Sequence, residues 1–201
     1  PPSGYLQAVR ELCTARNVLM VADEIQSGMG RAGAVFACDL VDVQPDVRIL
    51  GKALGGGLLP VSAVTADWAV LGVIGPGQHG STFGGNPLAA AVGIAVVELM
   101  ETSGLADRSR RLGEHVLATL LGARRPGITA RRGSGLWWAV ELDGTGRTGR
   151  EVSLELLGRG ILAKDTHTWT IRFAPPLVID ETDLDHALMT IVDVLSTSPG
   201  D

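Results

Sequence analysis

Two apolar runs of the chain end abruptly in polar residues. Residues 18–22 and 47–50 have the length and the β-branched content that are typical of buried parallel strands. Ligands of open α/β sheets bind at the carboxyl ends of such strands. The pattern therefore predicts that Asp23, Gln26 and Lys52, which follow the two runs, lie at one site.

The remaining apolar spacing predicts a succession of helices and short strands. Helices are expected over 4–17, 88–100, 105–121, 151–159 and 182–195, and strands over 60–65, 128–132, 136–142, 161–163 and 170–173. Glycine and proline punctuate the chain at 122–127. The alternation after residue 104 indicates a small α+β domain. The chain is thus expected to be α/β, with a mostly parallel sheet flanked by helices in 1–104 and a small domain in 105–201.

Composition narrows the class of protein. The 201 residues are 45% hydrophobic, with a net charge of −5 and a pI near 5.4, and they contain no long run of Lys and Arg, which argues against binding nucleic acid. No apolar stretch reaches the roughly 18 residues that span a membrane, and no signal peptide opens the chain. Neither Cys13 and Cys38 nor the histidines have metal-ligand spacing, so we expect a cytoplasmic protein without a metal.

The residue types at the predicted site suit carbonyl chemistry. A lysine in a partly desolvated pocket loses its proton more easily and can form a Schiff base with an aldehyde. Pyridoxal phosphate (PLP) needs such a lysine, and it also needs an anion against its ring nitrogen. Lys52 and Asp23 fit these roles, and the Gln26 amide could donate to the phenolate oxygen beside the aldehyde.

Three further positions are candidates for binding anions. Ser81 and Thr82 offer hydroxyl groups in a glycine-rich segment ahead of a helix that Asn86 would cap, but they could equally be ordinary turn residues. Arg172 lies in a predicted strand, where its guanidinium would either bind a carboxylate in a bidentate manner or form a surface salt bridge. For Arg31, in a loop, a structural role is favoured over a phosphate contact.

Six segments carry a resemblance to a known family. Four of them resemble, in order, the class III aminotransferases of PLP fold type I: 23–31 (DEIQSGMGR), 51–57 (GKALGGG), 60–64 (PVSAV) and 79–87 (HGSTFGGNP). Within that class, 161–167 (ILAKDTH) and 171–179 (IRFAPPLVI) look most like the ornithine aminotransferases. The resemblance extends from about residue 3 to about residue 196.

The resemblance implies a role for each candidate. Lys52 would be the Schiff-base lysine, and Asp23 and Gln26 would hold the PLP ring. Ser81 and Thr82 would bind the cofactor phosphate of the partner subunit in a dimer. Residues 1–104 would then be the carboxyl-terminal part of the PLP-binding large domain.

The implied reaction moves the δ-amino group of L-ornithine to 2-oxoglutarate, giving glutamate 5-semialdehyde, which cyclises to pyrroline-5-carboxylate, and glutamate. Arg172 would bind the α-carboxylate of 2-oxoglutarate or glutamate. Family members are about twice as long, so the chain resembles a carboxyl-terminal half. The chain lacks the family's upstream phosphate loop, the aromatic residue that stacks on the ring and the glutamate that neutralises Arg172. The resemblance therefore implies that the site is incomplete without the missing amino-terminal half.

Three alternatives stay open. The chain could act on acetylornithine, 4-aminobutyrate or another ω-amine. It could be a noncatalytic remnant or an assembly partner of a separately encoded amino-terminal half. It could also be a truncated product whose uncovered apolar faces cause aggregation.

Overall fold

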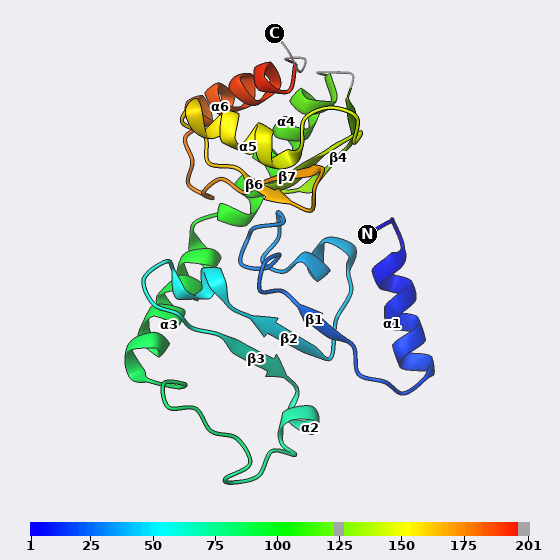
Figure 1. The fold of residues 1–201 in the computed structure, drawn as a ribbon. Helices are drawn as coiled ribbons and strands as arrows, with labels where there is room; N and C mark the ends of the chain where they lie inside the picture. The colour runs from blue at the N-terminus through cyan, green and yellow to red at the C-terminus, as the bar shows by residue number, and fades with distance from the viewer. Residues whose placement is uncertain (123–126, 197–201) are drawn as a thin grey trace. The chain divides into compact units, whose positions relative to one another are not determined.

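The computed structural model describes residues 1–122 and 127–196 and divides into two compact units (Figure 1). Unit 1 comprises Pro1–Gly30 and Ala34–Ala106, and unit 2 comprises Arg31–Gly33 and Asp107–Asp201. Most of the punctuation expected at 122–127 lies outside the described residues.

Unit 1 contains a three-stranded sheet in the order β1-β2-β3. Its strands are β1 (Val21–Asp23), β2 (Val47–Leu50) and β3 (Ala63–Ala66). β1 and β2 are parallel, so that Asp23 is in register with Ile49, whereas β3 runs antiparallel to β2. The sheet is therefore mixed rather than mostly parallel.

The first strand differs from its prediction in position and in burial. It begins at Val21 rather than at Val18, because the chain at Val18 still completes the end of the preceding helix by donating its N–H to the Cys13 carbonyl. The expected buried strand is also wrong, since Val18, Leu19 and Val21 are each more than half exposed. The reason is that the small apolar core of unit 1 includes no residue of β1, so these side chains stand on uncovered faces of the sheet.

Helices surround the sheet of unit 1. They are α1 (Tyr5–Ala15), α2 (Trp68–Leu71) and α3 (Pro87–Thr102), with the 3₁₀ helices η1 (Ala37–Val41) and η2 (Lys52–Gly55). Asn86 caps α3 as predicted, because its side chain accepts a hydrogen bond from the Ala89 N–H and Pro87 begins the helix. A small apolar core joins Leu50 and Leu54 to Met29 and Met100.

A buried carboxylate holds the turn that follows β1. Glu24 is 2% exposed, and its carboxylate accepts hydrogen bonds from the Ser27 hydroxyl and from the backbone N–H groups of Ala37 and Cys38. Burial, together with the nearby charge of Glu24, raises the pKa of the Cys38 thiol to about 11. Glu24 thus ties the turn of residues 24–30 to η1.

Unit 2 packs three helices on one four-stranded antiparallel sheet. The helices are α4 (Leu105–Gly122), α5 (Gly149–Gly158) and α6 (Glu181–Val194), and the strands are β4 (Ile128–Ser134), β5 (Trp137–Leu142), β6 (Lys164–Thr166) and β7 (Thr170–Phe173), in the order β4-β5-β7-β6. The strand expected at 161–163 is wrong by three residues. Ile161 and Ala163 instead pack against the core, and pairing starts where Lys164 lies opposite Arg172.

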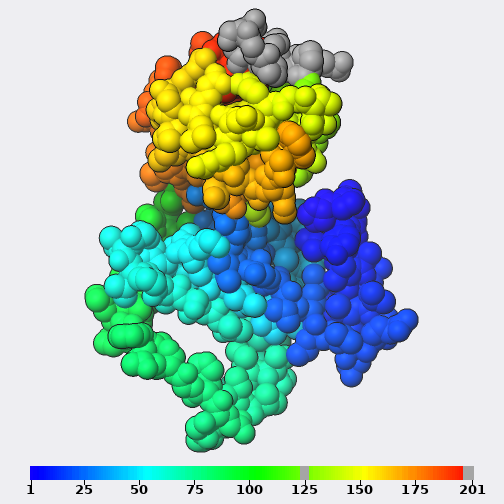
Figure 2. All heavy atoms as spheres, viewed as in Figure 1, coloured from blue at the N-terminus to red at the C-terminus, as the bar shows by residue number. Residues whose placement is uncertain are grey.

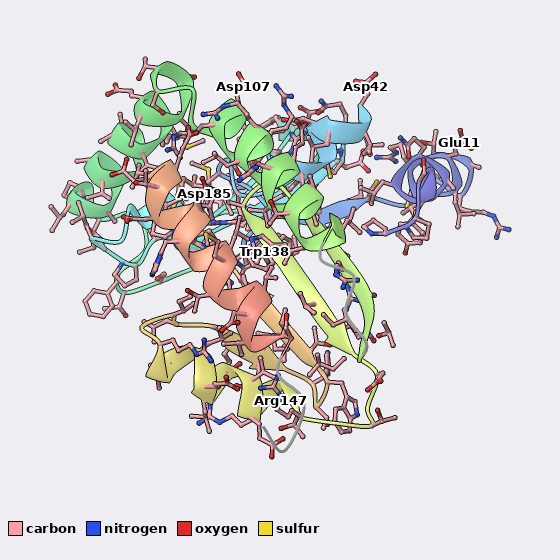
Figure 3. The ribbon with its side chains drawn as sticks, turned by 90° about the horizontal axis from the view of Figure 1, so that it is seen from above. Glu11, Asp42, Asp107, Trp138, Arg147 and Asp185 are labelled. Atoms are coloured by element: carbon pink, nitrogen blue, oxygen red, sulfur yellow. The ribbon has the colours of Figure 1, made fainter. Side chains whose placement is uncertain are left out.

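The core of unit 2 lies between the helices and one face of the sheet. Trp138 is buried and stacks on Phe173 with ring centroids 4.1 Å apart, and it lies on the side of the sheet that α4 and α6 cover (Figure 3). The neighbouring Trp137 is half-buried, as expected for adjacent strand residues that face opposite sides.

Residues 31–33 are joined to unit 2 by hydrogen bonds. The buried Ser109 hydroxyl donates to the Arg31 carbonyl and accepts from the Leu136 N–H. At the same place α4 approaches a loop so closely that a Cβ on Gly113 would lie 2.1 Å from the Gly135 carbonyl oxygen. Glycine at 113 is therefore required by the backbone contact rather than by its own φ angle.

No single helix among the described residues is long and apolar enough to span a membrane. α3 and α4 together have the required length and apolarity, but they are bent by 63° at the break between them. No group of three or more His, Cys, Asp or Glu side chains in 1–122 and 127–196 could hold a metal ion.

Replacing Glu24 by Ala is expected to lower the free energy of unfolding by about 3 kcal/mol, because two backbone N–H groups would lose a charged acceptor inside the fold. Glu98, an exposed residue of α3, is the matched control, and its replacement by Ala should change the free energy by less than about 0.5 kcal/mol. Urea denaturation of both variants measures the difference. Equal losses would contradict the role of Glu24.

Gly113→Ala is expected to destabilise unit 2 by about 2 kcal/mol or more, although alanine is normally the better helix former, because the new methyl group would collide with backbone. Gly158, at the end of α5, has no atom within 4 Å of an added Cβ. Gly158→Ala should therefore leave the melting temperature unchanged or raise it slightly. Thermal unfolding measures the melting temperatures of both variants. Equal melting temperatures would contradict the close contact at Gly113.

Candidate functional site

The carboxyl ends of β1 and β2 bring three of the candidate residues to one edge of unit 1. Asp23 is the last residue of β1 and is in register with Ile49, and the next residue donates its N–H to the Ile49 carbonyl. Lys52 begins η2, three residues beyond Ile49. Gln26 lies in the turn after β1. Parallel pairing thus positions Asp23 and Lys52 at the ends of neighbouring strands.

The Asp23 carboxylate is held by its own turn. Its Oδ1 accepts a hydrogen bond from the Ile25 N–H at 3.0 Å, which fixes the side chain at the strand end. Within the part of the chain that the structure describes, Oδ2 has no hydrogen-bond partner. One carboxylate oxygen therefore remains available for a cationic or N–H group of a ligand.

Lys52 is exposed and has a strained backbone. Its φ angle is +44°, a left-handed conformation that non-glycine residues rarely adopt and that is often found at functional sites. Its ammonium forms no hydrogen bond or ion pair with any described residue. The free amine is thus not used by the fold of unit 1.

Glycines allow close packing around Lys52. A Cβ on Gly51 would come within 3.5 Å of the Ile25 side chain, which belongs to the turn after β1. Gly56 has a φ angle of +60°, and its added Cβ would approach Val96 of α3 to 3.1 Å. Gly56 therefore lets η2 lie close to α3, whereas a side chain at Gly51 would make only ordinary van der Waals contact with the β1 turn.

Gln26 is half-buried, and its side-chain amide has no hydrogen-bond partner among the described residues. Because the Glu24 carboxylate ties the same turn to η1, the position of Gln26 is fixed by its neighbour rather than by its own side chain. The amide is free to bind a group at the edge that Asp23 occupies.

Ser81 and Thr82 lie in an exposed segment between α2 and α3. The Ser81 hydroxyl accepts a hydrogen bond from the Gly84 N–H, and no hydrogen bond links either residue to Asp23, Gln26 or Lys52. Figure 2 shows that this segment stands away from the rest of unit 1 with open space between them. Unit 1 thus does not bring these hydroxyls to the edge where Asp23 lies.

Arg172 belongs to unit 2. It lies in β7 opposite Ala139 of β5 and Lys164 of β6 and is half-buried, and its guanidinium has no partner among the described residues. The surface salt bridge considered from the sequence is absent from the described part of the chain. An unpaired, half-buried guanidinium is a good receptor for a carboxylate.

Arg31 has a structural role, as favoured from the sequence. Its guanidinium donates to the carbonyls of Leu136 and Pro175 at 2.9 and 2.6 Å, all within unit 2. Burial lowers the pKa of Arg31 from its ordinary value. These carbonyl contacts hold residues 31–33 against unit 2.

Sequence reasoning missed Glu24 and overlooked Lys164 as a neighbour of Arg172. The sequence did contain a signal for Glu24, because it lies between Asp23 and the apolar Ile25 at the end of a strand. A second carboxylate at such a position needs hydrogen-bond donors of its own. The register that brings Lys164 opposite Arg172 could not be read from the sequence, because the strand was expected at 161–163.

The site of unit 1 combines a free lysine amine, a carboxylate with one free oxygen and a free amide at a glycine-lined edge. A lysine amine can bind a carbonyl carbon covalently, and a carboxylate can hold a protonated ring nitrogen. This donor set fits an aromatic aldehyde with a basic ring nitrogen, and it offers no set of metal ligands among the described residues.

Comparisons with known proteins indicate a family whose chemistry suits these side chains. A family model described as Aminotransferase class-III matches residues 1–195. The chain is 52% identical over 196 residues to an ornithine aminotransferase of Bacillus cereus and 51% identical over 195 residues to that of Bacillus subtilis. These alignments cover 98% and 97% of the chain but 49% and 48% of the relatives, so the chain spans about half the length of the curated relatives it matches.

Solved structures give the same picture. The structure of an ornithine aminotransferase from Toxoplasma gondii matches with a TM-score of 0.94 and 41% identity, covering 97% of this chain and 47% of that one. An acetylornithine aminotransferase from Elizabethkingia anophelis matches with a TM-score of 0.91 and 44% identity, covering 97% and 50%. The α/β fold and the family resemblance predicted from the motifs are confirmed, and the chain belongs to the class-III aminotransferase family.

Proposed function

We propose that this chain carries the catalytic lysine of an ornithine δ-aminotransferase that uses PLP. The whole protein would transfer the δ-amino group of L-ornithine to 2-oxoglutarate, giving glutamate 5-semialdehyde and glutamate. The observation that carries the proposal is the placement of Lys52 and Asp23 at the carboxyl ends of neighbouring parallel strands, both with unused polar atoms. The relatives named ornithine aminotransferase support the choice of substrate.

Each residue at the edge of unit 1 has a defined task. When bound, PLP supplies an electron sink that stabilises negative charge on the carbon next to the reacting nitrogen. Asp23 would hold the protonated ring nitrogen through its free oxygen, and the Gln26 amide would donate a hydrogen bond to the ring oxygen. The amine of Lys52 would hold the aldehyde group of the cofactor and would act as general base and acid for the proton at the Cδ of ornithine.

Arg172 would bind a carboxylate of the oxo acid. Its guanidinium offers two parallel N–H donors, which match the two oxygens of a carboxylate, and no described side chain occupies them. Arg172 belongs to unit 2 and Lys52 to unit 1, so the proposed roles are divided between the two units.

We further propose that the active assembly contains an amino-terminal half and a second copy of the site. Unit 1 exposes large apolar side chains, with Trp68, Phe83 and Leu58 each at least 80% exposed. Large aromatic side chains such as Trp68 and Phe83 are enriched at the interfaces of natural proteins. Ser81 and Thr82 lie beside Phe83 in the outlying segment, where they could reach the cofactor phosphate of a partner subunit.

A second candidate substrate has its own support. The acetylornithine aminotransferase of Elizabethkingia anophelis is 44% identical to this chain, so acetylornithine is the competing amine. A panel of L-ornithine, N-acetylornithine and 4-aminobutyrate, each paired with 2-oxoglutarate, distinguishes the candidates. Faster turnover of either competitor would replace ornithine as the substrate.

Titration of the chain with PLP, alone and with a matching amino-terminal half, is expected to produce a visible absorbance band that L-ornithine bleaches. The chain contains two lysines, Lys52 and Lys164, so each can be tested. Lys52→Ala should abolish the band, whereas Lys164→Gln should retain it. A band that persists in Lys52→Ala, or that never forms in the wild-type mixture, would refute the catalytic role of Lys52.

A further inference from the structure

The sheet of unit 2 places two cationic side chains directly opposite each other. In the register of the sheet, Lys164 of β6 pairs with Arg172 of β7, Arg172 pairs with Ala139 of β5, and Ala139 pairs with Arg132 of β4. Residues directly opposite on antiparallel strands project to the same face of a sheet. Lys164 and Arg172 therefore lie side by side on one face, with Arg132 two strands away.

This face is the one that the helices of unit 2 leave uncovered. The core of the unit contains Trp138, Val140, Ile171 and Phe173, which alternate along β5 and β7 with Ala139 and Arg172. The apolar side chains of α4, α5 and α6 pack on these residues. Because side chains alternate between the two faces of a strand, Arg172 and Lys164 face away from that core.

The charges of the pair are not balanced within unit 2. Glu141, the carboxylate nearest to Arg172 in the register of this face, forms an ion pair with Arg132. Asp165, the carboxylate next to Lys164 in sequence, is bound by Arg150 at 3.4 Å. Neither the Lys164 ammonium nor the Arg172 guanidinium has a hydrogen bond or an ion pair in 1–122 or 127–196.

Two like charges directly opposite on neighbouring strands are destabilising. Their Cβ atoms are only about 5 Å apart in such a pair, so the ammonium and the guanidinium can converge on one anion. An anion bound between them removes the repulsion and gains charge-assisted hydrogen bonds from both. The pair is thus costly to the free chain and favourable once a carboxylate is present.

We propose that Lys164 and Arg172 together form a two-cation seat for one carboxylate of the oxo-dicarboxylate substrate, and that Lys164 determines specificity there. The assignment to 2-oxoglutarate rests on the proposed function. 2-Oxoglutarate carries two negative charges at neutral pH, whereas L-ornithine carries a net positive charge. Lys164 adds to the attraction for the first and to the repulsion of the second, so it favours the oxo acid over the diamine at this face.

The shapes of the two cationic side chains complement each other. Arg172 presents a planar fork that can occupy both oxygens of a carboxylate, while the Lys164 ammonium is a compact charge on a flexible stem that adjusts to the remaining lone pairs. The turn that joins β6 to β7 contains His167 with a φ angle of +54°, and it brings Lys164 back opposite Arg172. The short turn therefore fixes the spacing of the two strands that carry the seat.

Titration of the ¹⁵N-labelled full chain with 2-oxoglutarate at constant ionic strength tests this inference. Backbone amide signals of β6 and β7 are expected to shift in the wild-type chain. Lys164→Gln should weaken the apparent affinity for 2-oxoglutarate about fivefold or more, because a charge-assisted contact is lost at a partly exposed site. Lys164→Arg should restore most of the affinity, and the response to L-ornithine should not weaken in either variant.

The control removes an equal charge elsewhere in unit 2. Arg111 is exposed and paired with Glu181 at 2.7 Å, so Arg111→Gln should leave the affinity within twofold of wild type. The proposal would be contradicted if the wild-type signals of β6 and β7 did not shift. It would also be contradicted if Lys164→Gln and Arg111→Gln lost equal affinity for 2-oxoglutarate. Neither result depends on the absorbance band of Lys52, which tests the proposed function separately.

Discussion

The parallel pairing of β1 with β2 is the constraint on which the site depends. Two strands that run in the same direction end at the same edge, so a carboxylate after one and a lysine after the other become neighbours without any contact between them. The pairing alone would leave the following turn free to move. The Glu24 carboxylate prevents this by accepting hydrogen bonds from two backbone N–H groups of η1. A buried charge that serves only the backbone thus orients the exposed residues on either side of it.

The two units differ in the size of their apolar cores. Unit 2 has a contiguous core in which Leu136, Val140, Leu156 and Ile171 are fully buried. Unit 1 has a small core around Leu50 and Met100 and exposes large apolar side chains along its outlying segment and on α3. This asymmetry agrees with a chain that spans about half the length of its relatives.

Much of the fold and of the candidate site could be predicted because local chemistry and tertiary structure agree. β2 and α3 were predicted closely, since an apolar run with sharp ends and an Asn-Pro start leave few alternatives. β1 and β6 were misplaced because pairing rather than apolarity decides where a strand begins. Val18 completes a helix end, and Lys164 pairs with Arg172 although it is polar. The misplacement of β6 also hid the two cations, since a shift of three residues changes which side chains share a face.

Reduction of the PLP-treated chain with borohydride, followed by peptide mapping, tests the central claim most directly. Borohydride makes the bond between a lysine and the cofactor permanent, and the two lysines lie on opposite sides of the division between the units, Lys52 in unit 1 and Lys164 in unit 2. The account predicts that the added mass is found on the peptide that contains Lys52. Labelling of Lys164 in preference to Lys52, or equal labelling of both, would show that the edge formed by β1 and β2 does not select the cofactor and would contradict the account.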